Sequence, residues 1–208
     1  MADSKTPLEP GNFYHVYNHA VGNEKLFKTR NNYYFFLDKL WTYLSGFVDI
    51  YSYCLMPNHF HLLIRVKDHK SILSAIIDAD PPMKLKSGIV LPNIISRQFS
   101  HIFNSYAQSY NKENHRKGSL FYNRFKRKLV DSEEYLKKLI HYIHYNPLES
   151  GFIEELHEWP YSSYNELITN KETRIKRNEV LELFGDVENF KFCHILEPDE
   201  PYEGSEPS

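Results

Sequence analysis

The sequence predicts an α+β fold in which strands and helices are mixed along one domain of ordinary size, with a small appendage. Two observations support this prediction. Three short segments, 13–19, 47–55 and 59–66, are rich in β-branched and aromatic residues and are typical of strands. Longer segments repeat apolar residues every three or four positions, which is the pattern of a helix with one buried face.

The first third of the chain supplies most of the predicted sheet. Residues 47–55 and 59–66 are separated only by Met56-Pro57-Asn58, so we expect them to pair as a hairpin. In order, we expect a flexible lead-in over 1–11, the strand 13–19, a helix capped by Thr29 or Asn31 and stopped at Ser45-Gly46, and the two hairpin strands.

The remainder is expected to be mainly helical, with one further strand. The expected elements are a short helix over 71–77, a proline-containing loop over 80–92, a long helix from Asn93 with a core stripe through Ile95, Phe99, Ile102, Phe103, Tyr106 and Tyr110, a strand over 120–130, a helix capped by Asp131 and ended by Pro147, and short helices within 178–192.

Charge is distributed unevenly. The net charge is −2, but residues 186–208 hold seven acidic residues and one lysine, so the preceding body is mildly basic and compatible with nucleic acid. Cys54 and Cys193 are too few and too far apart for a disulfide framework or a thiolate zinc site. Because we find neither a signal-peptide pattern nor a long apolar run, we expect a cytoplasmic protein with no membrane partner.

The segment around His59 and His61 is the first candidate site. Alternate side chains of a strand share a face, so the two imidazoles lie about 7 Å apart along the chain, while Phe60, Leu62 and Ile64 face the core. Neutral imidazole is a common ligand of divalent metals. The alternative is a strand with two surface histidines, since two ligands do not fill a coordination shell.

Basic and aromatic residues are interleaved between 112 and 130. This combination suits a phosphate backbone with bases beside it. The alternative is an edge strand that lysine and arginine protect from unwanted pairing. The candidate nucleic-acid-binding residues are Arg116, Lys117, Arg124, Lys126, Arg127 and Lys128.

The helix after Asp131 brings a second set of polar groups together. Its expected buried stripe is Leu136, Leu139, Ile140 and Ile143. Tyr142 and Asn146, four residues apart, share one flank, and Tyr145 lies on the side opposite the core. The Asn146 oxygen is a candidate third metal ligand and the Tyr142 hydroxyl a candidate nucleophile. The alternative for Tyr142 is an aromatic ring that merely covers the core.

Several motifs resemble one known family. His59-Phe60-His61 and the run from His141 to Pro147 that contains Tyr142 resemble the single-tyrosine HUH transposases, which include the REP-associated tyrosine transposases. The resemblance extends over residues 13–164 and includes 14–18, 53–61 and 118–121 with the basic strand that follows.

The resemblance implies a ferredoxin- or RRM-like antiparallel sheet with helices packed on one face. It implies a catalytic domain over 12–168. Outside the family match we expect a small helical extension over 169–195 and an acidic disordered tail over 196–208. The resemblance further implies that His59, His61 and Asn146 bind Mg²⁺ or Mn²⁺ and that Tyr142 attacks single-stranded, hairpin-bearing DNA to form a 5′-phosphotyrosine. In this family both monomers and homodimers occur.

Alternatives remain open from the sequence alone. The same fold can bind hairpin nucleic acid without cleaving it, or support a metal-dependent nuclease that uses water. Tyr135 and Tyr145 are rival tyrosines close to Tyr142. The residues considered as a general base are His15, His141 and His144, and the role of His19 is not assigned.

Overall fold

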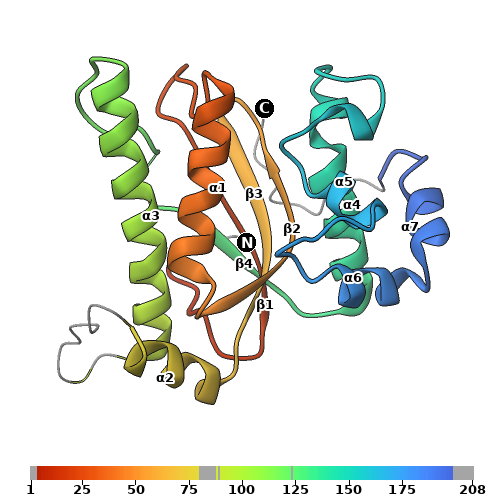
Figure 1. Ribbon diagram of the computed structural model, residues 1–208, viewed down its shortest axis with the longest axis horizontal. Coiled ribbons are helices and arrows are strands. Elements are labelled where there is room, and N and C mark those ends of the chain that lie inside the picture. The colour runs from red at the N-terminus through yellow and green to blue at the C-terminus, as the bar shows by residue number, and fades with distance from the viewer. Residues whose placement is uncertain (1–3, 80–87, 89, 123, 199–208) are drawn as a thin grey trace.

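The computed structural model describes residues 4–79, 88, 90–122 and 124–198. Four strands form one antiparallel sheet in the order β2-β3-β1-β4 (Figure 1). The strands are β1 (Phe13–His19), β2 (Val48–Leu55), β3 (His59–Val66) and β4 (Lys126–Val130). This order, with two helical crossovers, is that of a ferredoxin-like sheet, so the predicted α+β class and antiparallel sheet are confirmed.

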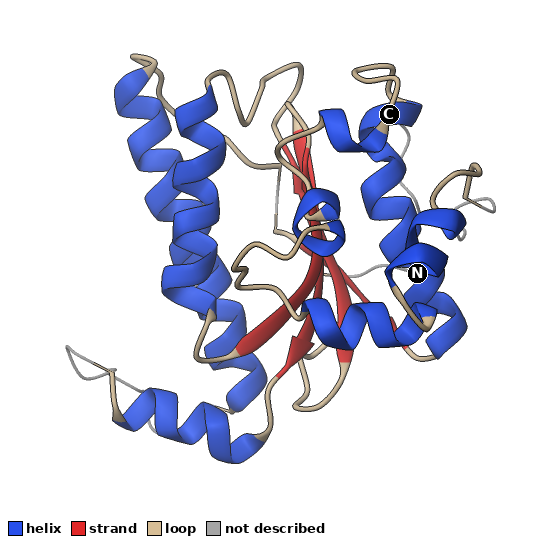
Figure 2. Ribbon diagram, turned by 45° about the vertical axis from the view of Figure 1, so that its right-hand side comes forward, coloured by secondary structure: helices blue, strands red, loops and turns tan. Residues whose placement is uncertain are grey.

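The helices lie on both faces of the sheet. Figures 1 and 2 show α1 and α3 on one side and α4 with the C-terminal helices on the other. We expected helices on one face only. Helix α4 instead lies on the face opposite α1, which is the face that carries His59 and His61. The helices are α1 (Arg30–Leu44), α2 (His69–Ile77), α3 (Leu91–Glu113), α4 (Glu133–Glu149), α5 (Tyr164–Ile168), α6 (Arg177–Phe184) and α7 (Val187–Cys193), with a 3₁₀ turn η1 (Leu156–Glu158).

The core lies between the sheet and the pair α1–α3. Phe60 of β3 is fully buried, and its ring centroid lies 5.2 Å from that of Phe36 on α1 and 5.7 Å from that of Phe103 on α3. The predicted stripe of α3 is buried throughout, as is the alternate set Phe60, Leu62 and Ile64. Because strand side chains alternate, this packing turns His59 and His61 toward the opposite face, as predicted.

The two edges of the sheet differ. The β2 edge is covered by later segments of the chain: Leu55 N–H donates to Tyr161 O, Ser163 N–H to Tyr53 O, and Lys176 N–H to Ile50 O. The other edge is β4, which pairs with β1 in the register Tyr17 opposite Lys126 and His15 opposite Lys128.

Three predicted boundaries are wrong. The strand expected over 120–130 is regular only from Lys126, because Leu120 and Phe121 are both buried and break the alternation. The cap of α4 is Ser132 rather than Asp131, since the Ser132 hydroxyl accepts the Tyr135 N–H at 3.2 Å. Helix α4 also continues past Pro147. Proline removes only its own N–H, and Ser150 N–H still donates to Asn146 O, so the last turn forms.

The expected division into domains stays a prediction. The structure describes residues of the expected lead-in and of the expected C-terminal extension. Leu8 of the expected lead-in is fully buried, and Ser4 O accepts a bond from Arg127. Helices α6 and α7 fall within the expected extension. Most of the expected loop 80–92 and residues 199–208 of the expected tail lie outside the described residues. Within the described part of the chain, no helix has the length and apolar character needed to cross a bilayer.

Candidate active site

The candidate residues on β3 and α4 meet on one face of the sheet, within a single chain. The ring centroids of His61 and Tyr142 lie 5.5 Å apart in an edge-to-face arrangement. The Nε2 atom of His59 lies 3.4 Å from the Oδ1 atom of Asn146. The four residues predicted as metal ligands and nucleophile are therefore neighbours, although Tyr142 lies 81 positions after His61 in the sequence.

Helix α4 presents these groups because its apolar stripe fixes its rotation. The predicted residues Leu136, Leu139, Ile140 and Ile143 are all at least 95% buried, so Tyr142 and Asn146 are held against the histidine face. The Asn146 Nδ2 group donates to Tyr142 O at 2.8 Å, one turn earlier. This bond uses the amide N–H and turns the amide oxygen toward His59.

The hydrogen bonds of His59 and Asn146 leave one acceptor atom of each residue facing the other. The Nδ1 atom of His59 lies 2.8 Å from Asn58 Oδ1, which only accepts, so Nδ1 carries the proton of the neutral ring. A lone pair on His59 Nε2 then faces the lone pairs of Asn146 Oδ1. An imidazole nitrogen and an amide oxygen 3.4 Å apart are a pair of acceptors that would suit a divalent ion.

The protonation of both histidines favours metal binding. Burial lowers the pKa of His59, with the nearby His19 adding to the effect. Burial also lowers the pKa of His61 well below its usual value, and the charges of His15 and His59 act in the same direction. Both rings are therefore neutral at pH 7. In the described residues, no group of three or more His, Cys, Asp or Glu is arranged to hold a metal, so a metal bound here would need the Asn146 oxygen as a third ligand.

Of the three tyrosines on α4, Tyr142 is the one beside His61, and Tyr17 of β1 also lies near, with its ring centroid 5.8 Å from that of His61. Tyr145 packs instead near His141, with ring centroids 5.9 Å apart, and Tyr135 lies under the ammonium group of Lys128. Burial raises the pKa of Tyr142, while its interaction with the Asn146 side chain lowers it. The hydroxyl is therefore protonated at pH 7 and needs help to become a nucleophile.

None of the three histidines considered as a general base is well suited. His144 is bonded through both nitrogens, to His194 Nε2 at 3.1 Å and Ser163 Oγ at 2.8 Å. His141 lies beside His194, with ring centroids 4.7 Å apart. His15 lies near Tyr142, but burial and Lys128 lower the pKa of His15 to about 3, so it binds a proton poorly.

The six basic candidates divide into two groups. Lys126 and Lys128 pair with Tyr17 and His15, so they lie on the histidine face. Arg127 points to the opposite face, where its guanidinium donates to Ser96 Oγ at 2.7 Å and Ser4 O at 2.9 Å. Arg116 is held by Glu24 at 2.9 Å. Lys117 and Arg124 are exposed. The structure therefore favours Lys126 and Lys128 over the two bonded arginines as phosphate contacts.

Two contacts were missed from the sequence. His15 bonds His61, because β1 and β3 are neighbours, and Asn58 bonds His59. Strand pairing between residues 46 positions apart cannot be read from a single sequence. His15 was therefore considered only as a general base, and its contact with His61 was not predicted. The position of Asn58 directly before His59 was visible, but its side-chain direction was not.

A buried pair of histidines, His144 on α4 and His194 directly after α7, links the two helices. His194 Nδ1 donates to Phe190 O at 2.8 Å, which leaves its Nε2 to accept from His144 Nδ1. His144 Nε2 then accepts the Ser163 hydroxyl proton. With both rings neutral, each ring nitrogen of His144 and of His194 has a hydrogen-bond partner in this chain.

We expect acid to destabilise the fold through His194. Burial and the nearby His141 lower its folded-state pKa to about 3, below the ordinary value of 6.5. The unfolded chain therefore binds the extra proton first, and stability present above pH 6.5 is lost as the pH falls toward 3. The slope approaches ~1.4 kcal/mol per pH unit for one proton. Urea unfolding at pH 7.5, 6 and 5 measures it. His194→Leu should flatten the dependence and the exposed control His157→Gln should not; equal slopes would contradict the assignment.

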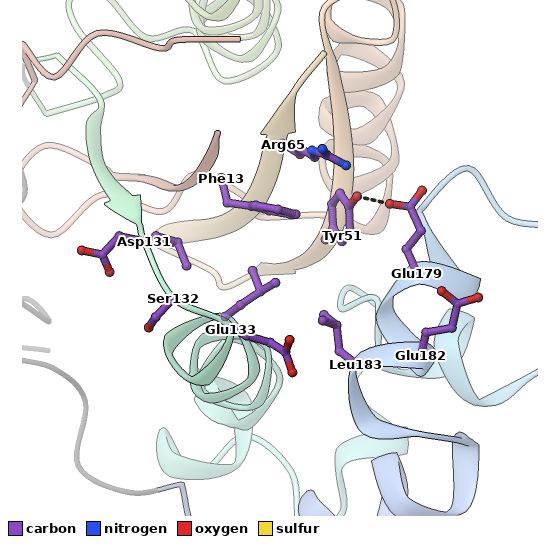
Figure 3. A pocket seen from close by; sticks show the side chains of 11 residues that line it. Phe13, Tyr51, Arg65, Asp131, Ser132, Glu133, Glu179, Glu182 and Leu183 are labelled. Atoms are coloured by element: carbon purple, nitrogen blue, oxygen red, sulfur yellow. Dashed lines mark hydrogen bonds between the residues drawn. The ribbon is translucent and has the colours of Figure 1, made fainter. Parts of the chain in front are cut away.

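A separate groove of about 530 Å³ lies near the start of α4, among β1, β3 and α6. Figure 3 shows Tyr51 directed at Glu179, to which its hydroxyl donates, with Arg65 nearby. The remaining lining includes Asp131, Glu133 and Glu182. Four carboxylates against one guanidinium repel phosphate, so this groove does not suit a DNA backbone.

Comparisons with known proteins agree with the motifs. The chain is 28% identical over 112 residues to a protein of Haemophilus influenzae (strain ATCC 51907 / DSM 11121 / KW20 / Rd) whose name assigns it to the REP-associated tyrosine transposases. This match spans 54% of the chain and 56% of the relative, so the chain matches about half the length of that relative. No protein-family model matches.

The fold is also shared with a solved structure. A REP-associated tyrosine transposase bound to a REP hairpin superimposes with a TM-score of 0.53, covering 82% of this chain and 87% of that one. The sequence identity is 13%, so this likeness shows the fold alone. Together, the sequence match and the shared fold confirm that the chain resembles the REP-associated tyrosine transposases.

Proposed function

We propose that this protein cleaves and rejoins single-stranded, hairpin-bearing DNA through a covalent bond to Tyr142. The observation that carries the proposal is the convergence of Tyr142, His59, His61 and Asn146 on one face of the sheet. The proposal is supported by the named relative and by the solved transposase of the same fold, which holds a hairpin.

The chemistry is a transfer of one phosphodiester. The Tyr142 hydroxyl loses its proton to water, and its oxygen attacks phosphorus and forms a P–O bond. The bond to the 3′ oxygen breaks, and that oxygen takes up a proton from water, so the strand leaves with a 3′-hydroxyl. The 5′ end remains as a phosphotyrosine, which conserves the phosphodiester energy for rejoining. A Mg²⁺ or Mn²⁺ ion held by His59, His61 and Asn146 would draw charge from the scissile phosphate and favour the phenolate.

The scissile phosphate must reach the histidine face. A single strand can bend to present it in line, whereas a stiff duplex cannot readily do so. Lys126 and Lys128 border the same face and are the expected contacts to neighbouring phosphates. The four candidate residues meet within one chain, which supports a site formed by a single protomer; whether the protein acts as a monomer or a homodimer stays a prediction.

The decisive experiment incubates the protein with Mn²⁺ and hairpin-bearing single-stranded DNA labelled at the 3′ end, then denatures the mixture. We expect a labelled protein–DNA adduct that survives denaturation. Cleavage without an adduct would identify a nuclease that uses water, and binding without cleavage would identify a binding module. Omission of the metal or addition of EDTA should abolish the adduct.

Tyr122 is expected to stack on a base beside the scissile phosphate. Its ring is 45% exposed and stacks on His19 at 4.6 Å, and His19 is the strand partner of His59. Because base stacking contributes about 1–3 kcal/mol, Tyr122→Ala should weaken DNA binding about 5- to 150-fold. Fluorescence anisotropy measures this. The control Tyr34→Ala removes a ring of similar exposure, 43%, on α1 across the sheet, and equal losses in both variants would contradict the assignment.

A further inference from the structure

His15 of β1 contacts His61, a candidate metal ligand on the neighbouring strand β3. Its Nε2 atom lies 2.9 Å from the Nδ1 atom of His61. The two rings are stacked, with centroids 5.1 Å apart and planes inclined by 24°. His15 is 8% exposed and His61 is 7% exposed, so this hydrogen bond is shielded from water.

The direction of this hydrogen bond decides whether His61 can bind a metal. Between two neutral imidazoles, one nitrogen donates and the other accepts. If His61 donates from Nδ1, its Nε2 keeps a lone pair and can ligate. If His15 donates instead, the proton of His61 is on Nε2, and neither nitrogen of His61 is available to a metal.

We propose that His15 is a positioning residue, which accepts the Nδ1–H of His61 and thereby holds Nε2 of His61 ready for a divalent cation. The purpose of this arrangement rests on the proposed function, but the hydrogen bond is a property of the metal-free protein. His15 touches neither substrate nor the reacting atoms in this role.

The arrangement around His59 supports the same direction. Asn58 Oδ1 accepts the Nδ1–H of His59 at 2.8 Å, which leaves Nε2 toward Asn146. Both histidines thus have Nδ1 occupied by a protein partner and Nε2 left for a ligand. Metal-binding histidines commonly use one nitrogen in this way, and loss of the partner typically weakens metal binding about 10- to 100-fold.

Two substitutions at one position separate the hydrogen bond from packing. His15→Phe keeps a planar ring against Tyr17 and His61 but removes the acceptor. His15→Gln places an amide oxygen near the position of Nε2 and keeps an acceptor. By isothermal titration with MnCl₂, we expect His15→Phe to raise the Mn²⁺ dissociation constant about 10- to 100-fold and His15→Gln to restore most of the affinity. Circular dichroism melting verifies that each variant is folded.

Nuclear magnetic resonance of the metal-free parent protein tests the proposal even if His15→Phe does not fold. Long-range ¹H–¹⁵N correlation spectra distinguish the two tautomers of His61, and we expect the proton on Nδ1. A proton on Nε2 would overturn the proposal, as would Mn²⁺ affinity in folded His15→Phe equal to that of the parent. If the parent does not bind Mn²⁺ but shows the expected tautomer, the metal step of the proposed function fails while the positioning by His15 stands.

Discussion

Tyr142→Phe is expected to eliminate the covalent DNA adduct and to reduce cleavage on the order of 10³-fold or more, because it removes the only atom that forms the new bond to phosphorus. The phenyl ring preserves the edge-to-face contact with His61, so folding, Mn²⁺ binding and DNA binding should remain close to those of the parent. Denaturing gels with labelled hairpin DNA measure the adduct, and anisotropy measures binding on the same samples.

Tyr145→Phe and Tyr135→Phe are the matched controls for this experiment. Each removes one hydroxyl from the same helix, but the Tyr145 ring contacts His141 and the Tyr135 ring lies under Lys128, whereas the Tyr142 ring contacts His61. Both variants should form the adduct. An adduct that persists in Tyr142→Phe and disappears in either control would reassign the nucleophile.

Of the substitutions proposed for this protein, Phe60→Ala is expected to cause the largest loss of stability, about 3–5 kcal/mol in the free energy of unfolding. Phe60 is fully buried between Phe36 and Phe103, and truncation leaves a cavity that the sheet cannot fill. Typical domains are stable by only about 5–15 kcal/mol. Because Phe60 lies between His59 and His61, a loosened strand should also weaken Mn²⁺ binding.

Urea unfolding followed by far-UV circular dichroism measures the effect of Phe60→Ala. Phe192→Ala is the control, since the Phe192 ring is 67% exposed and its loss should change stability by at most about 0.5 kcal/mol. A loss below about 1 kcal/mol for Phe60→Ala would show that Phe60 does not anchor β3 to the core.

Local sequence patterns were sufficient to predict much of the fold. The ends of β1 and β3 match the prediction because alternation and β-branched residues identify strands over short distances. Pro147 misled the prediction of the end of α4, since proline near a C-terminus removes a bond without preventing the last turn. Strand β4 was predicted too long because Leu120 and Phe121 have strand-like composition but are both anchored in the core.

In the candidate site, local patterns predicted which side chains share a face, but they did not predict which elements meet. Helical spacing placed Tyr142 and Asn146 on one flank, and strand alternation placed His59 and His61 on one face. Their meeting depends on α4 crossing the face opposite α1, which no local pattern specifies. The contact between His15 and His61 likewise depends on the pairing of β1 with β3, so only the three-dimensional structure reveals it.

The unequal edges of the sheet have a practical consequence for protein engineering. The β2 edge is closed by backbone bonds from later segments, whereas β4, at the other edge, carries lysine side chains of the kind that discourage strand addition by another molecule. We therefore expect Lys126 and Lys128 to contribute to colloidal stability as well as to ligand binding. Alanine variants made to weaken DNA contacts carry an aggregation risk, so glutamine or serine is the safer replacement, and light scattering should accompany every binding assay.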